Sequence, residues 1–134
     1  MREIMSEAET NRLGVLALAH VGDAVYELLI RGRLAAEGPS DVERLHRKTV
    51  GFVCAEAQSA AVERILPLLS DAESAVYRRG RNSHSHAAPR HAGAAEYHRA
   101  TGLEALFGWL YLQGKTDRIA ELFEKITEGS QDGA

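Results

Sequence analysis

Apolar side chains recur at intervals of three and four residues along most of the chain, and this spacing marks one face of an α-helix. The first such segment begins at Leu13 and continues to the sequence EGPS at 37–40, where proline cannot extend a helix. No segment shows the sustained alternation of apolar and polar residues that is typical of a half-buried strand. The pattern therefore predicts an all-α fold, with helices packed around one core.

Capping signals divide the middle of the chain into further helices. A serine followed three residues later by a glutamate forms a capping box, which marks the start of a helix. Two such pairs occur, Ser40 with Glu43 and Ser70 with Glu73. The first pair predicts a helix over residues 41–58, and Pro67 is expected to interrupt the helical region before the second pair.

The C-terminal third of the chain predicts two more helices. An apolar helix is expected over residues 102–113, followed by an amphipathic helix that Thr116 caps and Gly129 ends. Residues 80–97 are rich in glycine and serine and are typical of a loop, although the sequence AGAAEYHRA at 92–100 also fits the start of a helix.

The chain of 134 residues is long enough for one domain, and its 45% hydrophobic and 26% charged residues are ordinary for a globular protein. We expect an N-terminal segment over 1–12, a helical domain over 13–128 and a flexible tail over 129–134. No apolar run approaches the length of a membrane span, and the acidic N-terminus does not resemble a signal peptide. The one cysteine, Cys54, is interpreted as a small core residue, so we expect a soluble cytoplasmic protein.

Positive charge is concentrated in one part of the chain. The net charge is −3, yet residues 74–95 contain four arginines, three histidines and no acidic residue. A local basic segment on an acidic protein indicates an anionic partner at one place. Two other interpretations stay open, a solvated loop and a zinc site made by the three histidines of this region, His84, His86 and His91, with His98 as a further candidate ligand.

Two carboxylates lie in otherwise apolar predicted helices. Asp23 shares one helical stripe with His20, Glu27 and Arg31, and the simplest interpretation of this stripe is a solvated face with a Glu27–Arg31 ion pair. Glu104 is the one ionisable carboxylate of the apolar helix near the C-terminus.

A helix-interior glycine accompanies each carboxylate, Gly22 beside Asp23 and Gly108 one turn after Glu104. Such a glycine costs up to about 1 kcal/mol relative to alanine, so it needs a reason, either close helix packing or an uncovered carboxylate. If the two carboxylates meet, their repulsion requires a shared proton or a cation, and oxygen ligands favour Mg²⁺ or Mn²⁺. Such a metal near a basic segment would suit hydrolysis of a nucleic acid.

Several motifs resemble those of ribonuclease III and follow the order of that family. HVGDAVYELLIRGRL at 20–34 is similar to the family's signature helix, and GLEALFGWLYLQG at 102–114 is similar to its second acidic segment. Together with LHRKTV at 45–50 and RRGRN at 78–82, they are closest to the Mini-III ribonucleases, the small bacterial branch without a double-stranded-RNA-binding domain.

The resemblance implies an all-α homodimer that cleaves double-stranded RNA with Mg²⁺, or with Mn²⁺ as a substitute, and leaves 5′-phosphate ends. By position, it makes Asp23 and Glu104 the catalytic residues and metal ligands. His20 takes the place of an aromatic residue that inserts into the partner subunit, so it is expected at the dimer interface, with a surface histidine near the acidic site as the alternative. The implied role is maturation of large-subunit (23S) ribosomal RNA, on a precursor that carries a large-subunit ribosomal protein.

The resemblance also gives the basic residues a role, as contacts to RNA phosphates and 2′-hydroxyl groups. These are Arg78, Arg79, Arg81 and Asn82, with Arg47 and Lys48 in a smaller cluster for which a solvated face is an equal alternative. Two acidic groups of full-length ribonuclease III are replaced here by Ala19 and Thr101, which predicts more water around the metal. Their loss leaves open a catalytically silent RNA-binding or ribosome-assembly module on the same fold.

Overall fold

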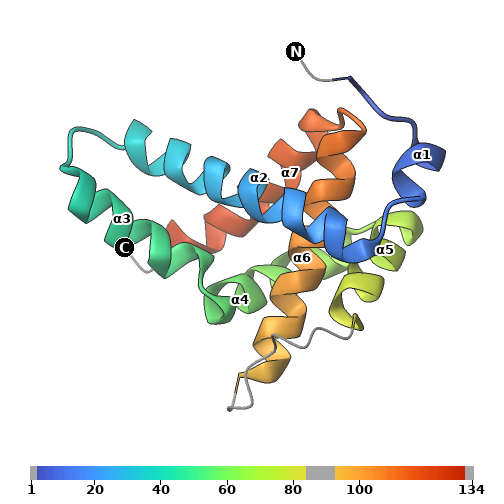
Figure 1. Ribbon diagram of the computed structural model, residues 1–134. Coiled ribbons are helices and arrows are strands. Elements are labelled where there is room, and N and C mark those ends of the chain that lie inside the picture. Colours follow the sequence, from blue (N-terminus) through green and yellow to red (C-terminus); the bar gives the residue numbers. More distant parts are fainter. Residues whose placement is uncertain (1–2, 84–92, 132–134) are drawn as a thin grey trace.

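The computed structural model describes residues 3–83 and 93–131, and every regular element in that part of the chain is helical (Figure 1). The all-α prediction is therefore confirmed. In chain order the elements are α1 (Glu7–Asn11), α2 (Val15–Ala36), α3 (Val42–Val53), α4 (Ala55–Ile65), the 3₁₀ turn η1 (Leu66–Leu68), α5 (Asp71–Arg81), α6 (Ala94–Leu112) and α7 (Thr116–Gln131). None of these described helices has the length and apolar content needed to cross a membrane.

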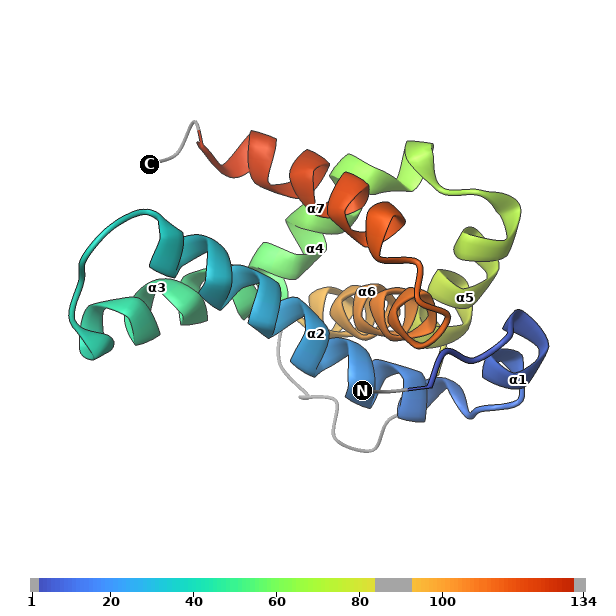
Figure 2. The ribbon, with the colours of Figure 1, turned by 90° about the horizontal axis from the view of Figure 1, so that it is seen from above.

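α6 is the central helix of the molecule. Figure 2 looks nearly along its axis and shows α2, α5 and α7 arranged around it, and α4 packs against it as well. Residues 100–110 of α6 are buried, except for the half-buried Glu104. Because α6 is apolar on almost every side, it is stable only where other helices enclose it.

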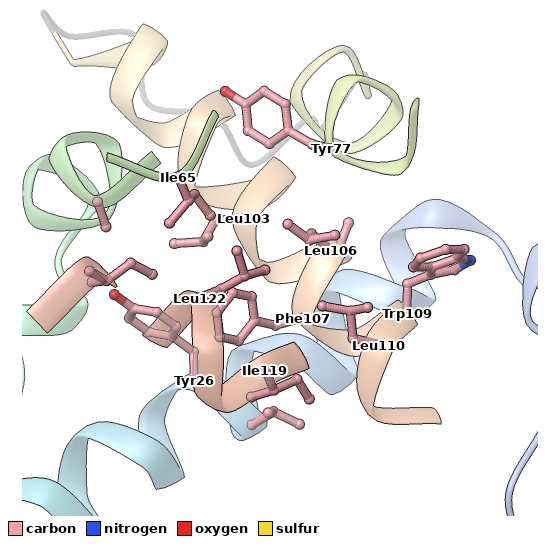
Figure 3. Packing of buried hydrophobic residues seen from close by; sticks show 14 of the residues in the cluster. Tyr26, Ile65, Tyr77, Leu103, Leu106, Phe107, Trp109, Leu110, Ile119 and Leu122 are labelled. Atoms are coloured by element: carbon pink, nitrogen blue, oxygen red, sulfur yellow. The ribbon is translucent and has the colours of Figure 1, made fainter. Parts of the chain in front are cut away.

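An aromatic cluster joins three helices in the core. The ring of Tyr26 from α2 lies edge-to-face against Phe107 of α6, with 5.4 Å between ring centroids, and against Phe123 of α7 at 6.2 Å. Leucines and isoleucines of α4, α6 and α7 fill the space around these rings (Figure 3). The cluster fixes α2 and α7 relative to the central helix.

Two glycines allow α2 and α6 to touch through their backbones. A Cβ atom on Gly22 would lie 1.6 Å from the carbonyl oxygen of Glu104, and one on Gly108 would lie 2.0 Å from the carbonyl oxygen of Leu18. A side chain at either position would push the helices apart. Close packing is therefore the reason for both glycines, and it places Asp23 next to the turn that contains Glu104.

A second close approach joins α5 to the same part of α6. A Cβ atom on Gly80 would lie 2.8 Å from the Cα atom of Gly102, and one on Gly102 would lie 2.7 Å from the Tyr77 ring. The last turn of α5 therefore packs directly against the turn of α6 that contains Glu104.

Two predictions for the middle of the chain are wrong in detail. The cap of α3 is Asp41 and not Ser40, since the Asp41 side chain accepts a hydrogen bond from the amide of Arg44 at 2.8 Å. The single helix expected over 41–58 is two helices, because Cys54 adopts an extended conformation between α3 and α4. Cys54 is half-buried at this junction, so it is not a core residue.

Other helix boundaries lie closer to those predicted from the sequence. The capping box of Ser70 and Glu73 opens α5, and the helical region is interrupted at Pro67, which lies in η1. α6 begins at Ala94, so the helical alternative is confirmed for residues 94–100. α7 continues to Gln131, past the end predicted at Gly129.

The N-terminal segment contains a helix that the apolar periodicity did not predict. Ser6 and Glu9 form a capping box that opens α1. The Trp109 ring Nε1 donates a hydrogen bond to Asn11 Oδ1 at 2.7 Å, and the Met5 amide donates to the Leu112 carbonyl at 2.9 Å. These bonds hold the segment against the C-terminal part of α6.

Replacing Gly22 with alanine is expected to lower the free energy of unfolding by about 3 kcal/mol, because the added methyl group overlaps the Glu104 carbonyl oxygen. Gly32 offers a matched control on α2, since a Cβ atom there meets nothing within 4 Å. Gly32→Ala should raise stability by up to about 1 kcal/mol through helix propensity. Urea unfolding measures both variants, and equal effects would contradict the crossing geometry.

Candidate active site

The crossing of α2 and α6 brings the two candidate carboxylates together. Asp23 directly follows Gly22, which touches the backbone of Glu104 across the crossing. The negative charge of Asp23 acts on Glu104, and Asp23 also favours the protonated form of Glu104 as a hydrogen-bond acceptor. Asp23 is exposed and Glu104 is half-buried, so the pair opens to solvent on the Asp23 side.

Burial and the neighbouring carboxylate raise the pKa of Glu104 to about 7. Removal from water is the larger cause, and the negative charge of Asp23 is the second. A hydrogen bond from Gln58 Nε2 to Glu104 Oε2, at 3.4 Å, acts against both effects by lowering the pKa of Glu104. Near neutral pH, a proton therefore occupies Glu104 in part of the molecules, and a cation in its place would allow both carboxylates to ionise.

The pair suits a hard divalent cation that retains water. Mg²⁺ commonly binds through one or two carboxylates and keeps several water ligands. Ala19 and Thr101 are each only 7% exposed and supply no carboxylate, and the Thr101 hydroxyl donates to the Tyr97 carbonyl at 3.1 Å. In the part of the chain that the structure describes, no group of three or more His, Cys, Asp or Glu side chains is placed to hold a metal ion. Asp23 and Glu104 would thus be the protein ligands.

Gln58 belongs to this site and was missed by the sequence reasoning. It lies on α4, and its amide contacts the Glu104 carboxylate from the core side. A signal was present in the sequence, because Gln58 shares the buried stripe of α4 with Ala61, Val62 and Ile65. A polar residue on an apolar stripe needs a partner elsewhere in the fold.

Two grooves lie along α2 near Asp23, and Asp23 lines one of them. The first, of about 440 Å³, is lined by His20, Asp23, Ala24, Glu27, Leu28 and Arg31. Glu27 and Arg31 form the predicted ion pair there. The second, of about 500 Å³, is mostly apolar and lies between α2 and the start of α7, with His20, Ala24, Leu28, Tyr111 and Ile119 among its lining residues. His20 is exposed and lines both grooves.

The predicted RNA-contacting residues of the basic segment lie on α5 and its cap. Arg81, which was expected in the loop over 80–97, is the last residue of α5, and Asn82 caps the helix. Arg78 and Arg79 are exposed. Arg81 is half-buried, with its guanidinium 5.8 Å from the centre of the Tyr77 ring and its Nε donating to Asn82 Oδ1 at 3.1 Å. The buried side of this turn packs against the part of α6 that contains Glu104, and Arg78 and Arg79 face solvent.

The smaller basic cluster lies on α3. Arg47 and Lys48 are both exposed, and Lys48 Nζ is 3.9 Å from Glu37 Oε1 at the end of α2. α3 packs beside α2, as Figure 1 shows, and the ion pair of Lys48 places this cluster at the C-terminal end of α2.

Most residues of the proposed zinc site lie outside the part of the chain that the structure describes. These are His84, His86 and His91, and Arg90 also lies outside it. His98 is half-buried on α6, and its ring lies edge-to-face with Tyr97 at 5.9 Å. The zinc interpretation therefore stays a prediction.

Comparisons with known proteins agree with this geometry. The Ribonuclease III domain family matches residues 16–115. The chain is 42% identical over 118 residues to the Mini-ribonuclease 3 of Symbiobacterium thermophilum, which covers 88% of this chain and 91% of that protein. It is also 42% identical over 122 residues to the Mini-ribonuclease 3 of a Thermoanaerobacter species, covering 91% and 86%. A crystal structure of a Fusobacterium nucleatum protein has a TM-score of 0.79 and 28% identity, covering 89% of this chain and 95% of that one.

The matched region contains the whole α2–α6 crossing, with both glycines and both carboxylates. The two helices that resembled the family's motifs in sequence are thus the two that pack together in space. On the family match and the identities across most of the chain, the protein belongs to the ribonuclease III domain family, within its Mini-ribonuclease 3 branch.

Proposed function

We propose that this ribonuclease III-type endoribonuclease is metal-dependent and cleaves double-stranded RNA. One observation carries the proposal: Asp23 and Glu104 are held together at a backbone contact of two helices, where their repulsion favours a cation. A fold that forces two carboxylates together without a cation would lose stability, so the arrangement needs a functional reason.

In this proposal Asp23 and Glu104 hold the ion, which is Mg²⁺ with Mn²⁺ as a substitute. A bound divalent cation would activate water and offset negative charge on the phosphodiester in the transition state. Because Asp23 is exposed, it faces the side from which RNA arrives, while the half-buried Glu104 anchors the site to the core. Cleavage would leave 5′-phosphate and 3′-hydroxyl ends.

Basic side chains on two elements support a duplex substrate. Arg78 and Arg79 on α5 and Arg47 and Lys48 on α3 are exposed and carry the charge that phosphates require. Contacts of this kind recognise A-form RNA by its backbone and 2′-hydroxyl groups and not by its base sequence. Arg81 and Asn82, which bond to each other, would complete the surface on α5.

The apolar groove beside the site supports a homodimer. Leu28 is 68% exposed on the groove, and His20 lies at its edge, where the family resemblance places the dimer interface. An apolar surface of this kind next to a charged site is typical of a protein–protein contact. A second copy covering it would place two carboxylate pairs on one assembly, one for each strand of a duplex.

The resemblance further leads us to propose maturation of large-subunit (23S) ribosomal RNA in the cytoplasm. A ribosomal protein on the precursor stays a prediction, because neither the described surface nor the comparisons identify one. The second candidate function is a catalytically silent RNA-binding or ribosome-assembly module. It is favoured by the absence of acidic groups at Ala19 and Thr101, which leaves only two carboxylates at the site.

Neutralising either carboxylate should lower cleavage of duplex RNA in Mg²⁺ by about 1,000-fold or more, because a lost ligand removes several kcal/mol of transition-state stabilisation. Asp23→Asn and Glu104→Gln are the test variants. Glu27→Gln is the matched control, since it removes one negative charge one turn from Asp23 but only breaks the ion pair with Arg31.

Electrophoresis of cleaved duplex RNA measures the rates. Full activity in Asp23→Asn and Glu104→Gln would contradict the site, whereas RNA binding without cleavage by the wild type would favour the silent module.

In the absence of metal, Glu104→Gln should be more stable than the wild type at about pH 8, because it removes a partly buried charge beside Asp23. The pKa of Glu104 in the folded protein, about 7, lies above its ordinary value of 4.5, so protonation stabilises the wild type as the pH falls. The difference in stability between the variant and the wild type should therefore shrink as the pH falls from about 7 to 4.5. Thermal unfolding at a series of pH values measures it, and a constant difference would contradict the raised pKa.

A further inference from the structure

Gln58 lies in the core beside the carboxylate pair, and half of its amide group lacks a partner. The residue is 1% exposed. Its Nε2 donates to Glu104 Oε2, but its Oε1 is the one buried side-chain oxygen or nitrogen among the described residues that makes no hydrogen bond. An unpaired buried acceptor is unfavourable, so an apolar residue of the same size would suit this position better for stability alone.

The surroundings of Gln58 hold it in a fixed position relative to α6. Ser59, the next residue on α4, accepts a hydrogen bond from Arg99 Nη1 of α6 at 2.9 Å. Two adjacent residues of α4 are therefore hydrogen-bonded to α6, Ser59 to Arg99 and Gln58 to Glu104. The amide of Gln58 is therefore presented to the Glu104 carboxylate by the packing of two helices.

A neutral amide suits a carboxylate that must also bind a cation. A carboxylate offers about four acceptor sites, so one N–H donor leaves the others available to a metal. A lysine or arginine in this position would neutralise Glu104 and compete with the metal ion, whereas glutamine supplies a donor without a charge. At 3.4 Å the contact is at the long end of the hydrogen-bond range, so a small rotation of the carboxylate makes or breaks it.

We propose that Gln58 is a positioning residue that orients the Glu104 carboxylate for metal binding through its Nε2–H donor. The inference rests on the proposed function, because it requires Glu104 to be a metal ligand. Gln58 acts through Glu104 and itself touches neither the metal nor the RNA. Its unpaired Oε1 is the stability cost of placing a donor at this point in the core.

The experiment compares Gln58→Met with Gln113→Met in the complete chain. Gln113 is also buried, and its Nε2 donates to the Trp109 carbonyl at 2.9 Å, so the same substitution removes a similar bond at the C-terminal end of α6. Electron paramagnetic resonance measures Mn²⁺ binding without RNA, and cleavage kinetics and thermal unfolding are measured alongside.

Gln58→Met should weaken Mn²⁺ binding about tenfold or more, as expected for loss of a group that orients a metal ligand. It should lower kcat while KM for RNA changes by less than about twofold. Its Tm should not fall, because the substitution also removes the unpaired Oε1. Gln113→Met should leave Mn²⁺ affinity unchanged.

In a Glu104→Gln background, Gln58→Met should cause no further loss of Mn²⁺ affinity, because its effect passes through Glu104. If Gln58→Met does not fold, Gln58→Asn keeps an amide in the core but withdraws the donor by one methylene group, and it should show the same loss. Unchanged Mn²⁺ affinity in a folded Gln58 variant, or an equal loss in Gln113→Met, would overturn the inference. A wild type that binds no Mn²⁺ would overturn the proposed function and this inference together.

Discussion

Backbone contact between α2 and α6 is the interaction on which the rest of the structure depends. Gly22 and Gly108 have no side chain because the carbonyl oxygens of Glu104 and Leu18 occupy that space. The contact sets the distance between the two longest helices, and the aromatic cluster around Tyr26 closes over it. It also determines which side chains meet, since Gly22 touches the backbone of Glu104 and Asp23 is the next residue on α2.

The same contact imposes an electrostatic cost. Glu104 is partly removed from water and lies beside the negative charge of Asp23, and both effects raise its pKa to about 7. A shared proton relieves the repulsion in the free protein, and a divalent cation would relieve it during catalysis. Gln58 adds a second cost, because it keeps an unpaired oxygen in the core in exchange for one donor to Glu104. Both costs occur at the site, and the Gln58 oxygen is the one unpaired buried side-chain polar atom among the described residues, which is typical of functional residues.

The sequence allowed much of this arrangement to be predicted, for identifiable reasons. Helical periodicity and the Ser70 capping box are local signals, and the glycines beside two lone carboxylates indicated a helix pair. The break at Cys54 carries no glycine or proline, so it depends on how α3 and α4 pack and not on local chemistry. Gln58 acts on a residue 46 positions away, and such a pairing is visible only in three dimensions. The placement of Arg81 on a helix was missed because glycine and serine nearby suggested a loop from residue 80 onward.

The central claim is that Asp23 and Glu104 form one metal site at the helix crossing. Broadening of backbone amide NMR signals by substoichiometric Mn²⁺ locates the bound ion directly, without RNA and without cleavage. We expect the strongest broadening at residues 22–24 and 103–105, and its loss in Asp23→Asn. Broadening centred on another acidic part of the surface, or unchanged in Asp23→Asn, would contradict it.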